Sequence, residues 1–221
     1  MQTITSLSVQ FGCGHHAPRS WLNFDSSPTL RFERIPLIGS IYTKNANRFP
    51  AHVRYGNIVR GLPIAKGTVE RLYASHVLKH LAYEDAMRAL RNCLLLLVPG
   101  GRFRLIVPDL AARARAYVAS TKSGDPAAAA QFMDATLLGE RQRPHGVFGM
   151  LSSIWGGAAH RWMWNEASMQ AALVEVGFDR VRRCSFGDSN EREFSEVENE
   201  ARFKDGEFLE LAMECRRPPA L

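Results

Sequence analysis

The sequence predicts an α/β protein built on a doubly wound, mostly parallel sheet that ends in an antiparallel hairpin. Apolar segments of strand length alternate with segments of helical periodicity along the 221 residues. A parallel sheet covered on both faces requires that order. The first strand-like segment ends in Gly12-Cys13-Gly14, and the second ends in Asp25. Two strand-like segments follow the last predicted helix, so we expect them to close the sheet as a hairpin.

The N-terminal part has strands but little room for a helix. Only six residues separate Gly14 from Trp21, and Pro18 is one of them. The first crossover helix must therefore be shortened or replaced by a loop. Residues 26–50 contain three prolines and a glycine, which predicts irregular structure with one short helix. The strands predicted in this part are residues 6–11, 21–25 and 52–55.

The remaining chain alternates between strands and helices. Residues 82–97 carry apolar side chains at helical spacing and are followed by Pro99-Gly100-Gly101, which favours a helix with a defined end. Residues 139–163 are rich in glycine and aromatic side chains and predict an irregular segment or lid. Residues 187–207 are highly charged and predict a surface helix or a long loop. The further predicted strands are residues 69–75, 103–107, 181–186 and 209–215. The predicted helices are residues 82–97, 109–120, 126–138 and 166–176, the last ended by Gly177.

Composition limits the class of protein. A chain of this length fits one domain, residues 1–221, with a large core. The longest apolar run, residues 93–98, is too short to cross a bilayer. With no signal-like N-terminus and four widely spaced cysteines, we expect a cytoplasmic protein with free thiols. The net charge of +6 comes from dispersed basic residues, which favours a solvated basic surface over a nucleic-acid site.

The segment from Gly12 to Asp25 predicts a nucleotide-type ligand. A turn without side-chain bulk after a buried strand lets a ligand lie against bare backbone, and an acid at the end of the next strand can accept hydrogen bonds from ribose hydroxyls. The alternatives are a plain tight turn at Gly12 and Gly14, and a helix cap or turn acid at Asp25.

A series of further motifs follows in a fixed order. They are Phe11-Gly12-Cys13-Gly14, the segment from Ser20 to Asp25, Gly61-Leu62-Pro63-Ile64, the segment from Leu72 to Leu81, Leu97-Val98-Pro99-Gly100-Gly101, the segment from Leu105 to Leu110, and Val176-Gly177-Phe178. Taken together they resemble the class I S-adenosylmethionine-dependent methyltransferases, most closely a small bacterial subgroup with a truncated first helix. The resemblance implies a Rossmann-like fold and S-adenosylmethionine as cofactor. This chain departs from the family in having Lys79 and Asn57 where an acid is usual, and Glu70 where Asp is usual.

The resemblance also implies roles for individual residues. The implied cofactor-binding residues are Gly12, Cys13, Gly14, Asp25, Asn57, Leu62, Ser75 and His76. The implied catalytic residues are His76, as a general base, and His80. The implied substrate-binding residues are Asp109, His160, Arg161 and Trp164. His76 and His80 have the i, i+4 spacing of a chelating pair, but no third ligand is evident, so no metal site is predicted.

Several of these residues also have purely structural interpretations. Asn57 can serve a turn after Gly56, and Leu62 can belong to the core. Asp109 can cap the helix that follows it, and Trp164 can cover the end of the sheet. The two histidines can be satisfied by local hydrogen bonds.

The function expected is methyl transfer to oxygen or nitrogen of a small-molecule or glycan-precursor acceptor. Two alternatives stay open. Lys79 and Asn57 favour a non-catalytic binding or scaffold protein with a degenerate methyltransferase fold. The positive charge favours an RNA methyltransferase, against which stands the lack of an Asn/Asp-Pro-Pro-Tyr-type motif in the sequence.

Overall fold

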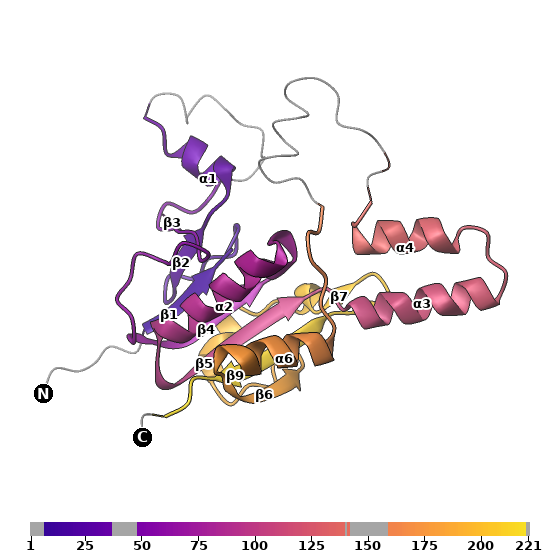
Figure 1. The fold of residues 1–221 in the computed structure, drawn as a ribbon. Helices are drawn as coiled ribbons and strands as arrows, with labels where there is room; N and C mark the ends of the chain where they lie inside the picture. The colour runs from indigo at the N-terminus through magenta and orange to yellow at the C-terminus, as the bar shows by residue number, and fades with distance from the viewer. Residues whose placement is uncertain (1–6, 37–47, 140, 142–158, 220–221) are drawn as a thin grey trace, which may run out of the picture.

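A seven-stranded sheet forms the centre of the structure, a computed structural model that describes residues 7–36, 48–139, 141 and 159–219 (Figure 1). Its strands are β1 (Leu7–Phe11), β2 (Leu22–Asp25), β3 (Arg54–Tyr55), β4 (Val69–Ser75), β5 (Leu97–Val107), β6 (Asp179–Cys184) and β9 (Leu211–Arg216). They lie in the order β3-β2-β1-β4-β5-β9-β6. β1 to β5 pair in parallel, and β9 is antiparallel to both β5 and β6. The predicted sheet with its antiparallel C-terminal pair is confirmed.

Helices follow the periodicity of the sequence. They are α1 (Pro28–Glu33), α2 (Tyr83–Leu96), α3 (Leu110–Lys122), α4 (Ala128–Thr136) and α6 (Glu166–Val176), with the short 3-10 helices η1 (Leu78–His80), η2 (Arg192–Glu196) and η3 (Glu200–Arg202). The start of α6 is fixed by Asn165 and Ser168, whose side chains each accept from the other's backbone amide. Its end is fixed by Gly177 at φ 109°, a conformation in which glycine has no Cβ penalty. The chain between β1 and β2 forms turns and no helix, as the short spacing predicts.

One face of the sheet is covered by helices through apolar side chains. Figure 1 shows α2 and α6 lying over the sheet on the same side. Leu90 of α2 and Leu173 of α6 are fully buried, together with Phe103 and Leu105 of β5. Burying side chains of this size stabilises the fold by roughly 1.5–3 kcal/mol each. This cluster is the main core of the molecule.

The opposite face is covered by a segment whose high charge predicts a position at the surface. Residues 187–203, here called the C-terminal cover, contain η2 and η3. Phe194 of the cover is buried against the rings of Trp21 and Tyr73, at centroid distances of 5.7 and 6.4 Å. The segment is held to the sheet because some of its carboxylates pair with arginines of β4 and β5, whereas others, such as Glu200, stay exposed.

The pairing centres on Arg104 of β5, which has no exposed surface. Its guanidinium contacts the carboxylates of Glu198, Glu214 and Asp188, the last two at 2.9 Å. Burying a charge is tolerated only when it is paired and hydrogen-bonded. The pairs with Glu198 and Asp188 therefore fasten the cover to the sheet, whereas Glu214 belongs to the neighbouring strand β9.

The two helices after β5 extend away from the sheet. In Figure 1, α3 and α4 project to one side as an antiparallel pair, held by Tyr117 against Phe132 at 5.2 Å. The small hairpin of β7 (Lys204–Asp205) and β8 (Phe208–Leu209) contacts α3 through Arg113, whose guanidinium lies 5.0 Å from the Phe208 ring. No helix within the described ranges is long and apolar enough to span a membrane.

Some element boundaries differ from those predicted. β5 begins at Leu97, six residues before the predicted start at residue 103, because Gly100, at φ 82°, lies within the strand at a shift in its register with β4 and does not end it. β6 begins and ends two residues before the predicted 181–186, and β9 begins two residues and ends one residue after the predicted 209–215. Most of the predicted lid, residues 139–163, lies outside the described residues.

Candidate functional site

The carboxyl ends of the parallel strands bring the predicted site residues to one edge of the sheet. β1 lies between β2 and β4, so the chain leaves the ends of β1 and β4 toward opposite sides. Ligands of open α/β sheets bind in the crevice at such a switch point. The glycine turn follows β1, Asp25 ends β2, and Ser75 ends β4.

The two glycines of the turn have different surroundings. Both have left-handed backbones, with φ 65° at Gly12 and 56° at Gly14. A Cβ at Gly12 would lie 2.1 Å from Cγ2 of Val77, whereas a Cβ at Gly14 would meet nothing within 4 Å. Gly12 is therefore required by the close approach of the chain after β4, and the open side of the turn is at Gly14.

Asp25 is almost fully buried and fastens this turn. Its carboxylate accepts from the backbone amide of Gly14 at 3.0 Å and from that of Ser27 at 2.7 Å. A carboxylate has about four acceptor positions, so two remain for a ligand. Cys13, between the glycines, is buried, and burial followed by the charge of Asp25 raises the pKa of its thiol to about 12. The thiol is thus protonated at neutral pH.

Two residues predicted to hold the cofactor serve local structure. Asn57 Oδ1 accepts from the Val59 amide at 2.9 Å, the turn chemistry that was its structural alternative. Leu62 is 6% exposed and belongs to the main core. A Cβ at Gly56 would lie 2.9 Å from Leu62 Cδ2 and 2.6 Å from Phe24 Cδ1, which shows how tightly this corner is packed.

His76 follows β4 with a left-handed backbone, φ 59°, which a non-glycine residue adopts only when its surroundings enforce it. Its Nε2 lies 2.9 Å from the Arg202 carbonyl oxygen. A carbonyl only accepts, so Nε2 carries the proton and Nδ1 keeps its lone pair. That Nδ1 is buried and has no hydrogen-bond partner among the described residues. Burial, ahead of the charges of Lys79 and Arg202, lowers the pKa of His76 to about 4.

A second group lies where η1 meets the chain that leads into α6. The His80 and His160 rings are 5.8 Å apart, edge to face. The Arg161 amide donates to the Lys79 carbonyl at 2.8 Å. His80, Arg161 and Lys79 reach solvent, whereas His160 is only 7% exposed.

Asp109 and Trp164, predicted to bind substrate, are 1% exposed each and join β5 to α6. The Asp109 carboxylate caps α3 by accepting from the amides of Ala111 and Ala112, and it pairs with Arg183 at 3.3 Å. Trp164 lies in the main core. Asp109 therefore caps a helix and Trp164 packs in the core, so both residues have structural contacts of the kind that their alternative interpretations describe.

The C-terminal cover also contacts this edge, and the sequence does not predict that contact. The Glu196 carbonyl oxygen lies 3.0 Å from His16 Nε2, and the Glu196 carboxylate accepts from the Ser20 hydroxyl. Arg202 supplies the carbonyl that binds His76. The sequence signal was weak, because Phe194 and Val197 are the only apolar residues in the polar run 191–198.

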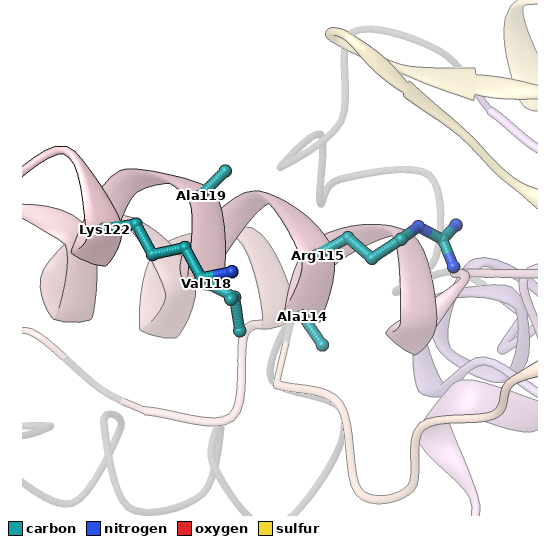
Figure 2. Close-up of a pocket in the computed structure, with 5 residues that line it drawn as sticks. All are labelled: Ala114, Arg115, Val118, Ala119 and Lys122. Carbon is teal, nitrogen blue, oxygen red and sulfur yellow. The ribbon is translucent and has the colours of Figure 1, made fainter.

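Two cavities lie away from this edge. One of about 400 Å³ is lined by Ala114, Arg115, Val118, Ala119 and Lys122, all on α3 (Figure 2). The other, about 190 Å³, lies between α3, α4 and β8. Neither is lined by any of the predicted site residues.

No protein-family model and no curated protein sequence matches this chain. Solved structures do. A chain in the complex of the Haloferax volcanii Trm112 methyltransferase activator with a putative methyltransferase is 13% identical, with a TM-score of 0.50 over 98% of this chain and 84% of that one. An S-adenosylmethionine-dependent methyltransferase, possible histamine N-methyltransferase, from Thermotoga maritima is 15% identical, with a TM-score of 0.49 over 96% and 82%.

A further match, the structure of PigF with S-adenosylhomocysteine, is 12% identical with a TM-score of 0.46, and this chain spans 50% of its length. The chain has the class I methyltransferase fold. Identities this low establish the fold, so activity has to be argued from the site.

Proposed function

We propose that the chain binds S-adenosylmethionine between the Gly12–Gly14 turn and Asp25, and transfers its methyl group to oxygen or nitrogen of a small-molecule or glycan-precursor acceptor. The observation that carries the proposal is the hydrogen bond from the Gly14 amide to Asp25 at 3.0 Å. It holds an open, left-handed turn and a buried carboxylate together at the switch point of the sheet.

The residues of this edge fit such a cofactor in two respects. Gly14 leaves room for a ligand against the backbone. Asp25 has acceptor positions left for ribose hydroxyls after binding two backbone amides. The cofactor, when bound, supplies a methyl group on a positively charged sulfur.

His76 is proposed to orient the acceptor. Its Nδ1 keeps a lone pair that can accept a hydrogen bond from the hydroxyl or amine to be methylated. A pKa near 4 makes it a weak proton acceptor, so alignment of the nucleophile is a better assignment than full proton removal. His80 and Ser75 stay candidates at the same edge.

Calorimetric titration with S-adenosylmethionine and S-adenosylhomocysteine tests the cofactor site. Asp25→Asn keeps the size and one acceptor of the side chain but removes its charge. Because a hydrogen bond to a charged group contributes about 1.5–3 kcal/mol, we expect binding to weaken roughly tenfold to a hundredfold. The matched control is Asp134→Asn on α4, an exposed aspartate remote from the edge, which should leave binding unchanged. Absence of binding to the native protein, or equal binding by Asp25→Asn, would contradict the proposal.

A non-catalytic binding protein with the same fold is a second candidate. It is favoured because the Asn57 side chain and two of the acceptor positions of the Asp25 carboxylate are already bound to backbone amides of nearby turns. Release of S-adenosylhomocysteine in the presence of pooled acceptors distinguishes the two: turnover supports an enzyme, and binding without turnover supports the second candidate. The RNA alternative gains no support, because buried basic residues such as Arg104 and Arg113 are paired with carboxylates.

A further inference from the structure

Three basic residues lie near the carboxyl end of β4. Lys79 and His80 belong to η1, and His160 lies in the chain before α6. The His80 and His160 rings are 5.8 Å apart. Backbone hydrogen bonds from Arg161 and Trp162 to the Lys79 carbonyl, at 2.8 and 3.4 Å, hold the two segments together. The grouping is therefore built into the backbone.

His160 is buried, and its ring lacks a full set of hydrogen-bond partners. It is 7% exposed, and neither ring nitrogen has a partner at full hydrogen-bond distance and angle among the described residues. The Thr136 carbonyl still acts on this ring as a hydrogen-bond acceptor, which leaves the other ring nitrogen without a partner, and buried polar groups in native structures almost always have one. Burial, ahead of the charges of Lys79 and His80, lowers the pKa of His160 to about 4. The ring is thus neutral at neutral pH and offers one N–H donor.

Lys79 is partly buried and lacks a counter-ion. No carboxylate of the described residues lies within 4.0 Å of its ammonium. The carboxylates whose charges act on it, Glu210 and Asp205, are bound by Arg113 at 3.0 and 2.9 Å. Burial lowers the pKa of Lys79, and Arg202 acts in the same direction.

The charge balance at this point is positive. Lys79 lowers the pKa of His76, His80 and His160, and Arg161 also acts on His80. The carbonyl of Ala159 acts against the shift at His80, and that of Thr136 acts against it at His160. Lys79 and the one ring N–H of His160 can donate to a carboxylate or phosphate oxygen. His80 Nδ1 lies 3.3 Å from the Ala159 carbonyl oxygen and carries the proton of the neutral ring, so His80 can donate to an anion through Nε2 only when it is protonated.

We propose that Lys79, His80 and His160 bind an anionic oxygen group, carboxylate or phosphate, of the methyl acceptor. That the anion belongs to a methyl acceptor rests on the proposed function. Anion binding by these residues can be tested without it. The three residues follow His76 at the same sheet edge, so an anion held there places the rest of a small molecule near His76 Nδ1. The acceptor class is then a negatively charged small molecule. An uncharged acceptor would leave Lys79 without a counter-ion.

Titration of the histidines by nuclear magnetic resonance, with and without inorganic phosphate or acetate, tests the subsite. An anion that contacts an imidazole stabilises its protonated form, so we expect phosphate or acetate to raise the pKa of His160 and His80. The probe that binds more tightly identifies the anionic group as phosphate or carboxylate. Lys79→Met should weaken binding of that probe about tenfold or more. The matched control is Lys66→Met, an exposed lysine before β4 at the opposite sheet edge, which should bind as the native protein does.

Three results would overturn the subsite. Neither anion moves the histidine pKa values of the native protein, a result that needs no variant to fold. Lys79→Met and Lys66→Met bind the probe equally. S-adenosylhomocysteine competes with the probe, which would assign the anion to the carboxylate of the cofactor. If S-adenosylhomocysteine does not bind but the probe does, the proposed cofactor fails and the anion subsite stands; the reverse result rejects the subsite alone.

Discussion

One face of the central sheet is covered by α2 and α6 through apolar side chains, whereas the other is covered by residues 187–203 through buried ion pairs and a few aromatic rings. Both covers exclude water from the same strands. On β5, Phe103 and Leu105 face the helices and Arg104 faces the C-terminal cover. Neighbouring residues of one strand thus take part in two kinds of packing.

The two covers depend to different degrees on the position of the groups that they contact in the sheet. Apolar burial is non-directional, so α2 and α6 can adjust to small changes in the sheet. An ion pair that is buried has to meet its partner closely, since each charge left alone carries a large desolvation penalty. The C-terminal cover also reaches the candidate site through Glu196 and Arg202, so its attachment and the shape of the site are linked.

Arg104→Met should have the largest effect on stability. It leaves the carboxylate of Glu198 buried without its cation, whereas Glu214 keeps Arg182 at 3.1 Å, and removing one member of a buried pair costs about 3–5 kcal/mol. Urea unfolding measures the loss. Hydrogen exchange should rise in residues 187–203 and stay low in α2. The control Arg60→Met, at an exposed arginine, should change stability by no more than about 0.5 kcal/mol. An equal rise in hydrogen exchange in residues 187–203 and in α2 would show that the two covers are not attached independently.

Leu90→Ala should be nearly as costly on the other face. Leu90 of α2 is fully buried, and such a truncation costs about 2–5 kcal/mol, depending on how far the cavity collapses. Leu95→Ala on the same helix is the matched control, because Leu95 is 41% exposed. Its loss should be less than about 1 kcal/mol. Equal losses for the two variants in urea unfolding would contradict the assignment of this face as the main core.

The smallest expected effect is on the pH dependence of the free energy of unfolding, which should change when the C-terminal cover is altered and not when the helical face is altered. His76, which binds Arg202 of the C-terminal cover, has a pKa lowered from 6.5 to about 4 by burial, ahead of its charged neighbours. Between these values the unfolded chain binds more protons, so stability falls as pH decreases, by up to roughly 1.4 kcal/mol per pH unit for one such group. Asparagine also adopts a left-handed backbone, so His76→Asn should reduce this slope in urea unfolding between pH 4 and 6.5.

Leu90→Ala should leave the same slope unchanged, because no titrating group is lost on the helical face. An unchanged slope in His76→Asn would show that His76 is not buried in its neutral form.

Elements that depend on local pattern were predicted well. β4 over residues 69–75 and α6 over residues 166–176 have the predicted bounds, because alternation, capping side chains and Gly177 act within a few residues of one another. The start of β5 was missed, since proline and glycines after α2 are compatible with both a turn and an extended chain.

The candidate site was predicted in outline but not in its contacts. Gly14 and Asp25 meet across eleven residues at neighbouring strand ends, as their positions after β1 and β2 indicate. Asn57, Leu62 and Asp109 could not be assigned, because the same residue type suits a ligand contact, a turn, a core position or a helix cap. Only their neighbours in space distinguish these cases.

The alternation of strands and helices along the chain and the sheet edge at which the motifs meet follow from periodicity and from residues close in the chain, so they could be predicted from the sequence. The class I methyltransferase fold was implied by the resemblance of the motif series, and the structure confirms it. Which charged and polar side chains are buried depends on tertiary contacts. Arg104 pairs with Glu198, and the His80 ring lies 5.8 Å from the His160 ring, across long stretches of chain. The free energy of a charge depends on its distance from others and on its exposure to water, and neither quantity is written in the sequence.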